Sequence, residues 1–285
     1  MIQRGRTELA GRLTGGRPTD VTGTVQVARG ELSGRVLTGL KGRFRWDGPR
    51  LELDLQEASY AGGTVHGRML REWKEGKFAN TITLDLADAM IEHMKQGTLL
   101  ADQAIHGALS AHLDLGWSGS DGASLIGKGE ASIQDGYLFS LPPLSAPLAV
   151  LSLNIGQRDP VIRTGRMLFH LDAEALAIDV LELPSDQVTV RAHGTLRKDG
   201  AVDLRVIANP GGPGGLRRIP VLKETAEGLR RFVNWVQERG LFVFRVKGPY
   251  RDPKVERVAL FGLANKDVVL YQRILEGKPP PEAVE

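Results

Sequence analysis

Apolar and polar residues alternate one by one along most of the chain. Leu51, Leu53 and Leu55 alternate with the acidic residues Glu52 and Asp54. The same alternation returns in six further segments, residues 82–86, 111–117, 176–180, 188–192, 202–206 and 242–246. A period of two with one apolar face is typical of strands in an antiparallel sheet. Roughly a dozen such strands are expected, and a sheet of that size curls strongly or closes. The pattern therefore predicts a mainly β protein, built as a barrel, a sandwich or an open trough.

Asp-Gly pairs mark the predicted turns between these strands. The pairs are Asp47-Gly48, Asp135-Gly136 and Asp199-Gly200, and such a pair between alternating runs is a strong hairpin signal. Residues 129–138 also repeat the spacing of residues 23–32, with two glycines seven positions apart and a leucine two positions further on. We interpret each copy as a strand, a tight turn and the start of the next strand.

Helical stretches are few. Residues 85–96 are predicted to form a short helix that ends at Gly97. The apolar, proline-rich segment 141–153 is expected to contain a short helix, and a last helix is predicted within residues 263–275. The proline-rich tail, residues 276–285, is predicted to be disordered.

One longer helix, over residues 220–239, is predicted to be amphipathic. Its apolar stripe and the arginines beside it are the residues Leu222, Leu229, Arg230, Arg231, Val233 and Val236. An apolar stripe of this kind most often packs against a sheet, and a basic amphipathic helix also suits an anionic membrane surface. A third interpretation is that the helix caps the end of an apolar trough.

Composition limits the classes of function. The 285 residues suffice for one large domain or two ordinary ones. The net charge is only +3, and no five or six cations cluster, so we predict no nucleic-acid partner. The absence of cysteine excludes disulfides and thiolate chemistry.

The sequence also lacks a targeting or membrane-spanning signal. It contains no run of about 18 apolar residues and no apolar region near its start that would suit a signal peptide. This pattern suits either a cytoplasmic protein or a piece of a longer protein whose targeting segment is missing. Residues 7–13 already follow a β-pattern, from which we expect the second.

Several residue patterns that could carry chemistry are better explained by structure. Residues 122–129 contain G-x-x-x-x-G-K, but glycine stands where a phosphate-binding loop has Ser or Thr, and a hairpin is predicted on both sides. The six histidines form no H-x-x-x-H motif, so no metal site is predicted. Asp54, Asp85, Asp114 and Asp203 alternate with apolar residues, as on a solvated sheet face, although a glycosidase-like pair of carboxylates stays an alternative. We therefore predict no catalytic residues and no cofactor, and a protein that is not an enzyme.

The order of these pieces resembles the C-terminal region of the AsmA-like family, relatives of AsmA and TamB in the envelope of diderm bacteria. Four segments carry the resemblance, residues 127–144, 168–183, 188–204 and 244–255. Their motifs consist of glycines, turn residues and alternating apolar positions, and their order is more specific than any one of them. The resemblance is good from about residue 122 to 262 and looser before it. We accordingly expect one elongated domain over residues 1–262, with a looser half at 1–121 and an AsmA-like half at 122–262.

The resemblance implies a long, open, taco-like β-groove with an apolar inner wall, which carries phospholipid or other acyl lipid across the periplasm. It implies a role in outer-membrane biogenesis, contact with a membrane surface and with envelope proteins, and an inner-membrane anchor in an N-terminal segment absent from this chain. An assembly scaffold that holds outer-membrane or secretion components through edge strands is the alternative. The residues predicted to line the groove are Leu51, Leu53, Leu55, Ile82, Leu84, Leu113, Leu115, Leu176, Ile178, Val188, Val190, Val202, Leu204, Val206, Phe242 and Phe244.

Overall fold

The fold is known from a computed structural model that describes most of the chain. The described residues are 2–14, 17–32, 34–98, 100–120, 123–150, 161–210, 234–236, 240–259 and 265–280. The strands are β1 (Ile2–Thr14), β2 (Arg17–Leu32), β3 (Arg35–Trp46), β4 (Arg50–Tyr60), β5 (Gly63–Lys74), β6 (Lys77–Met90), β7 (His106–Ser118), β8 (Ile126–Tyr137), β9 (Ile162–Asp172), β10 (Ala175–Pro184), β11 (Val188–Arg197), β12 (Ala201–Pro210), β13 (Phe242–Pro249) and β14 (Lys254–Arg257). The helices are α1 (Ile91–Met94), α2 (Pro142–Val150) and α4 (Asn265–Glu276).

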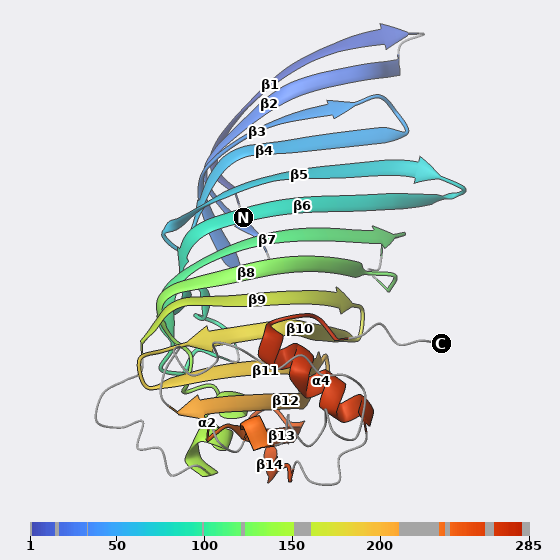
Figure 1. The fold of residues 1–285 in the computed structure, drawn as a ribbon. Helices are drawn as coiled ribbons and strands as arrows, with labels where there is room; N and C mark the ends of the chain where they lie inside the picture. Colours follow the sequence, from blue (N-terminus) through green and yellow to red (C-terminus); the bar gives the residue numbers. More distant parts are fainter. Residues whose placement is uncertain are drawn as a thin grey trace. The chain divides into compact units, whose positions relative to one another are not determined.

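The protein is mainly β, as the alternation predicts. The strand order in the sheet is the chain order from β1 to β14 (Figure 1), and β1 and β14 are its two edges. Neighbouring strands pair antiparallel. The prediction of a large, open antiparallel sheet with few short helices is confirmed.

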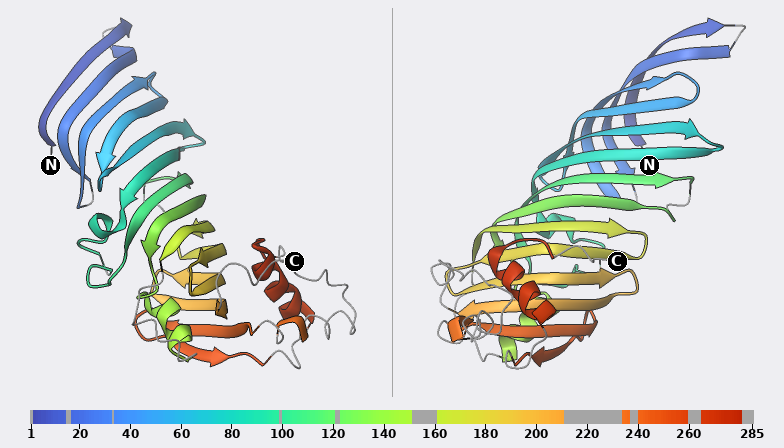
Figure 2. Two further views of the ribbon diagram at one scale, coloured as in Figure 1. Left: turned by 60° about the vertical axis from the view of Figure 1, so that its left-hand side comes forward. Right: turned by 45° about the vertical axis from the view of Figure 1, so that its right-hand side comes forward.

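The described chain divides into two compact units. Unit 1 comprises residues 1–102, 108–131 and 171–173, and thus strands β1 to β7 with the first half of β8. Within unit 1 the long strands lie side by side and bend along their length (Figure 2). Unit 2 comprises residues 103–107, 132–170 and 174–285, and carries β10 to β14 with α2 and α4.

Unit 2 has a covered sheet with an apolar core. On one side of β12 and β13, Ile207 and Val243 pack with Val268, Tyr271 and Leu275 of α4 in a buried cluster that also contains Val236, Leu241 and Ile274. On the other side, Leu204, Val206, Phe244 and Val246 are buried as well. Helix α2, in which Leu144 and Leu148 are buried, also packs against β12 and β13. Both faces of these strands are therefore removed from water.

The predicted helix over residues 85–96 is wrong for its first half. β6 continues to Met90, and only Ile91–Met94 are helical. The strand passes through an irregularity between Leu86 and Ala89, where Asp88 has a φ of 55°, and Ala89 then pairs with Leu109. Pairing with the neighbouring strands outweighs the helix propensity of this alanine-rich segment.

The predicted turn at Asp135-Gly136 is also wrong. Both residues lie inside β8, where Asp135 has a φ of 46°, a left-handed conformation that bulge positions within a strand also adopt. The first copy of the glycine repeat, residues 23–32, lies wholly within β2. The repeat therefore marks long irregular strands, whereas Asp47-Gly48 and Asp199-Gly200 do lie in the turns that precede β4 and β12.

The helices at 142–150 and 265–276 confirm the predictions for the proline-rich segment and the C-terminal helix. Most of the predicted helix 220–239 lies outside the described residues, and within it residues 234–236 are helical. Of the predicted tail, Lys278 donates its backbone N–H to the carbonyl of Arg273, and residues 281–285 lie outside the described part.

Candidate functional site

Strand register in unit 1 brings apolar residues from six strands onto one face of the sheet. Because paired residues in neighbouring strands point to the same side, each row of partners lies on a single face. The first row consists of Gly23, Phe44, Leu53, Met69, Ile82 and Leu115. The second row consists of Val25, Gly42, Leu55, Gly67, Leu84 and Leu113. The third row consists of Val21, Trp46, Leu51, Arg71, Asn80 and Trp117. We call these three rows the apolar face of unit 1.

The apolar face of unit 1 is not covered in the way that the sheet of unit 2 is. Its large side chains are half-buried, and Leu53 at its centre is 37 % exposed. Among the described residues of unit 1, the fully buried apolar side chains are Val27, Ala58, Ala89 and Ile91. Two of these four are alanines, so the described part of unit 1 has no packed core of large side chains. A sheet of this kind normally buries its apolar face against a second layer.

The opposite face of the same strands is polar and carries ion pairs. Lys41 Nζ lies 2.8 Å from Glu57 Oε2, and Arg68 lies 3.2 Å from Glu52 Oε1. Partial burial alone would raise the pKa of Glu52, but the guanidinium groups of Arg50 and Arg68 hold it below its ordinary value. Exposed pairs of this type stabilise a fold little, and they keep this face wet.

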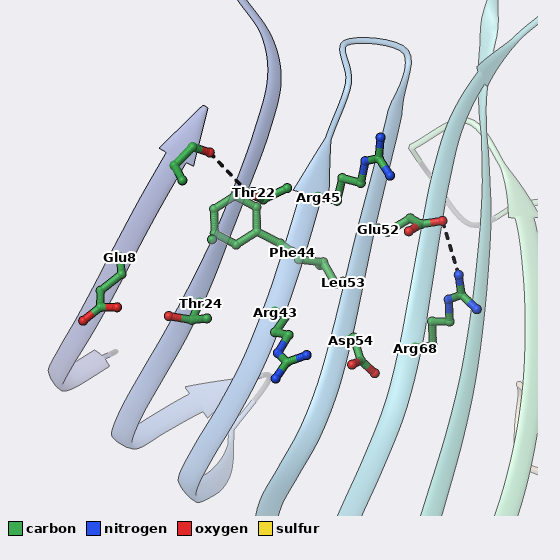
Figure 3. Close-up of a pocket in the computed structure, with 12 residues that line it drawn as sticks. Glu8, Thr22, Thr24, Arg43, Phe44, Arg45, Glu52, Leu53, Asp54 and Arg68 are labelled. Atoms are coloured by element: carbon green, nitrogen blue, oxygen red, sulfur yellow. Dashed lines mark hydrogen bonds and ion pairs between the residues drawn. The ribbon is translucent and has the colours of Figure 1, made fainter. Parts of the chain in front are cut away.

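A depression of about 770 Å³ lies over β1 to β5 (Figure 3). Phe44 and Leu53 of the apolar face line it together with polar and charged residues, among them Glu52 and Arg68. In the register Asp54 stands between Arg43 and Arg68, so acidic and basic side chains alternate across the strands. Figure 3 shows the ion pair between Glu52 and Arg68 at one side of the depression. The charges of the depression are thus largely matched by their neighbours.

Among the described histidines, His112 lies between two carboxylates. His112 Nδ1 donates a hydrogen bond to Asp85 Oδ1 at 2.7 Å, and its Nε2 lies 3.5 Å from Asp114 Oδ2. The hydrogen bond to Asp85 and the charges of both carboxylates raise the pKa of His112, against a smaller opposing effect of burial. Within the described part of the chain, no three His, Asp or Glu side chains are grouped so as to hold a metal ion.

The predicted groove residues fall into two different environments. Leu51, Leu53, Leu55, Ile82, Leu84, Leu113 and Leu115 lie together on the apolar face of unit 1. Leu176 and Ile178 are half-buried on β10. Val188, Val190, Val202, Leu204, Val206 and Phe244 are buried in the unit 2 sheet, and Phe242 beside them is half-buried. Leu204 is only 4 % exposed, so it belongs to a closed protein core rather than to an open wall.

The predicted helix residues fall largely outside the described part of the chain. Leu222, Leu229, Arg230, Arg231 and Val233 are among the residues not described. Val236 lies in the buried cluster under α4. At this position, therefore, the segment packs against its own unit.

Several residues of the apolar face were not among the predicted set. Phe44, Trp46, Met69, Arg71 and Trp117 join the face through the register. Phe44, Trp46 and Trp117 alternate with polar neighbours, so their pattern could have identified them. Arg71 breaks the alternation by its charge, and only the pairing with Leu51 and Asn80 places it on this face.

Comparison with known proteins does not assign the chain to a group. No family model matches it, no curated protein is similar to it, and no solved structure matches its fold. Among the described residues, no helix combines the length and the apolar character needed to cross a membrane.

Proposed function

We propose that this protein is a non-enzymatic lipid-binding module that carries acyl chains on the apolar face of unit 1. The observation that carries the proposal is the uncovered state of that face in the described structure. A large apolar patch on a protein surface usually marks a ligand or a partner. Acyl chains fit such a surface because they need a continuous apolar contact and little directional chemistry.

The size of the face suits this role. Six neighbouring strands at about 4.8 Å spacing span roughly 24 Å, and the four steps from Asn80 to Leu84 on β6 cover about 13 Å along a strand. Each methylene group that leaves water contributes about 0.8 kcal/mol. One chain of ordinary length laid on this face therefore gains enough to bind without a specific polar contact.

The setting in which the module acts follows from the AsmA-like resemblance alone. On that basis we propose that it belongs to the bacterial cell envelope, with lipid transfer in outer-membrane biogenesis as its task and the periplasm as its location. Phospholipid, a membrane surface and other envelope proteins are the proposed partners.

The proposal is tested by lipid loading of the protein purified from bacteria. Native mass spectrometry and lipid extraction should find phospholipid on the wild-type chain. Leu53→Asp places a charge on the most exposed leucine of the apolar face. Because a carboxylate is poorly tolerated next to acyl chains, this substitution should lower the bound lipid at least tenfold.

Thr81→Asp is the matched control, since Thr81 is exposed on β6 and pairs with Leu70 and Gly116 on the opposite face. It should leave the loading unchanged. A lipid-free wild-type protein, or equal loss in both variants, would show that the apolar face does not hold lipid.

The alternative role as an assembly scaffold has one observation in its favour. β1 is an edge strand of thirteen residues, and its outer side pairs with no strand of the described part of the chain. Such an edge can accept a strand from another protein. If this were the main function, the purified protein would form strand-paired assemblies that substitutions on the apolar face do not affect. The described residues do not favour a glycan enzyme, which would need a pair of free carboxylates. Asp54 lies between two arginines in the register, and Asp114 accepts a hydrogen bond from Thr83 at 2.8 Å.

A further inference from the structure

One end of the apolar face of unit 1 carries a single charged side chain. Arg71 stands in the third row, between Leu51 of β4 and Asn80 of β6. Met69 and Trp73, two residues before and after it on β5, point to the same side. Arg71 is the only charged residue in the three rows, so it does not belong to the alternating charges of the polar face.

Arg71 also lacks a negatively charged partner among the described residues, although it lies on a largely apolar surface. Its guanidinium carbon lies 3.8 Å from the centre of the Phe78 ring. Its Nε is buried without a hydrogen-bond acceptor, and no carboxylate of the described residues forms an ion pair with it. Arg68, three residues earlier and on the other face, does pair with Glu52. Arg71 as a whole is half-buried, and a partly desolvated cation without an anion beside it is complementary to a negatively charged ligand group.

The same end of the face collects tryptophans. Three of the four tryptophans of the chain are here, Trp46 and Trp117 in the row of Arg71 and Trp73 next to it. Trp73 is 51 % exposed and meets Phe78 edge-on at 4.7 Å between ring centres. Tryptophan is favoured where an apolar layer ends and water begins. The third row therefore has the composition of a boundary between acyl chains and polar headgroups.

We propose that Arg71 binds the phosphate of a lipid headgroup, while the acyl chains of that lipid lie on the first and second rows of the apolar face. This inference rests on the proposed function and adds to it the orientation and the headgroup class of the lipid. The planar guanidinium donates two parallel hydrogen bonds to a phosphate.

The test compares two lipids that differ only in the phosphate. Phosphatidic acid and diacylglycerol with the same acyl chains are offered in detergent to the purified full chain, and the bound lipid is quantified by mass spectrometry. A hydrogen bond to a charged group is worth about 1.5–3 kcal/mol, which corresponds to a preference of roughly 10- to 150-fold for phosphatidic acid. Arg71→Met, which keeps an unbranched apolar stem but removes the guanidinium, should reduce this preference to about one and leave diacylglycerol binding intact. Arg71→Lys, which keeps the charge, should restore part of it.

Lys74→Gln serves as the control, because Lys74 lies on the same strand, faces the other way and pairs with Glu72. It should retain the full preference. If wild-type protein binds both lipids equally, or if Arg71→Met keeps the preference, the headgroup inference fails although the proposed function stands. If neither lipid binds to the wild type, the proposed function itself fails. Equal loss of both lipids in a folded Arg71→Met variant would give Arg71 a structural role instead.

Discussion

Leu53 and Leu204 have the same side chain and the same place in an alternating strand, but the structure gives them different surroundings. Leu204 is 4 % exposed in the core of unit 2, whereas Leu53 is 37 % exposed on the apolar face of unit 1. Truncation of a buried leucine removes its transfer free energy and leaves a cavity. We predict that Leu204→Ala lowers the free energy of unfolding by about 3 kcal/mol. Leu53→Ala should lower it by less than about 1 kcal/mol.

Chemical denaturation followed by circular dichroism measures both values. Comparable losses at the two positions would mean that unit 1 is covered as tightly as unit 2, and would remove the basis for a binding face.

His112 provides a prediction about pH on the polar face of unit 1. The hydrogen bond to Asp85, with the charges of Asp85 and Asp114, raises the pKa of His112 above its ordinary value of 6.5. A raised pKa means that the folded state holds the proton more tightly than the unfolded chain. The contribution to stability is therefore complete below the unfolded pKa, and it is lost as the pH rises through the higher folded value.

Titration of the His112 ring by NMR should give a midpoint above 6.5. Asp85→Asn should lower this midpoint. Asp54→Asn is the control, because Asp54 lies on the same face but has no histidine beside it in the register, and it should leave the midpoint unchanged. A midpoint at or below the ordinary value would contradict the contact between His112 and Asp85.

Two glycines of the hairpin formed by β11 and β12 are required for different reasons. Gly194 has a φ of 147°, and a Cβ there would meet the backbone carbonyl oxygen of Asp203. Gly200 in the turn has a φ of 82°, with nothing within 4 Å of an added Cβ. Gly194→Ala should therefore cost about 3 kcal/mol or more, because the backbone itself must move. Gly200→Ala should cost only the 1–2 kcal/mol or so of a left-handed conformation.

Thermal unfolding of the two variants measures both losses of stability, and Gly194→Ala should have the lower melting temperature. The reverse order of stability would show that the close pairing of Gly194 with β12 is not formed.

At the level of elements, the alternation of single residues identified most strands, since period two is a direct consequence of the pleat. The alternation did not identify the segments in which a strand continues although its residues no longer alternate. Residues 85–90 are rich in alanine and acidic residues, and only their pairing with β5 and β7 makes them a strand. Asp135-Gly136 carries a turn sequence that the structure uses as an irregular position inside β8. Whether such a segment continues as a strand depends on its pairing with neighbouring strands, and a local sequence pattern carries no information about that pairing.

At the level of the whole molecule, the sequence could not separate a covered apolar face from an uncovered one. Alternation is equally regular in β4 and in β12, but among the described residues only the strands of unit 2 receive α2, α4, Val236 and Leu241 as covering groups. For the same reason the candidate site was predicted in part. The predicted leucines of β4, β6 and β7 share one face in the register, whereas the place of Arg71 depends on the register of β5.

Quenching of tryptophan fluorescence by a phospholipid with brominated acyl chains tests the central claim most directly. Three of the four tryptophans lie at one end of the apolar face of unit 1, and bromine quenches only at short range. If acyl chains occupy this face, the brominated lipid quenches most of the tryptophan emission, the same lipid without bromine does not, and Leu53→Asp abolishes the effect. Lipid that binds without quenching, or quenching that survives Leu53→Asp in full, would contradict the account.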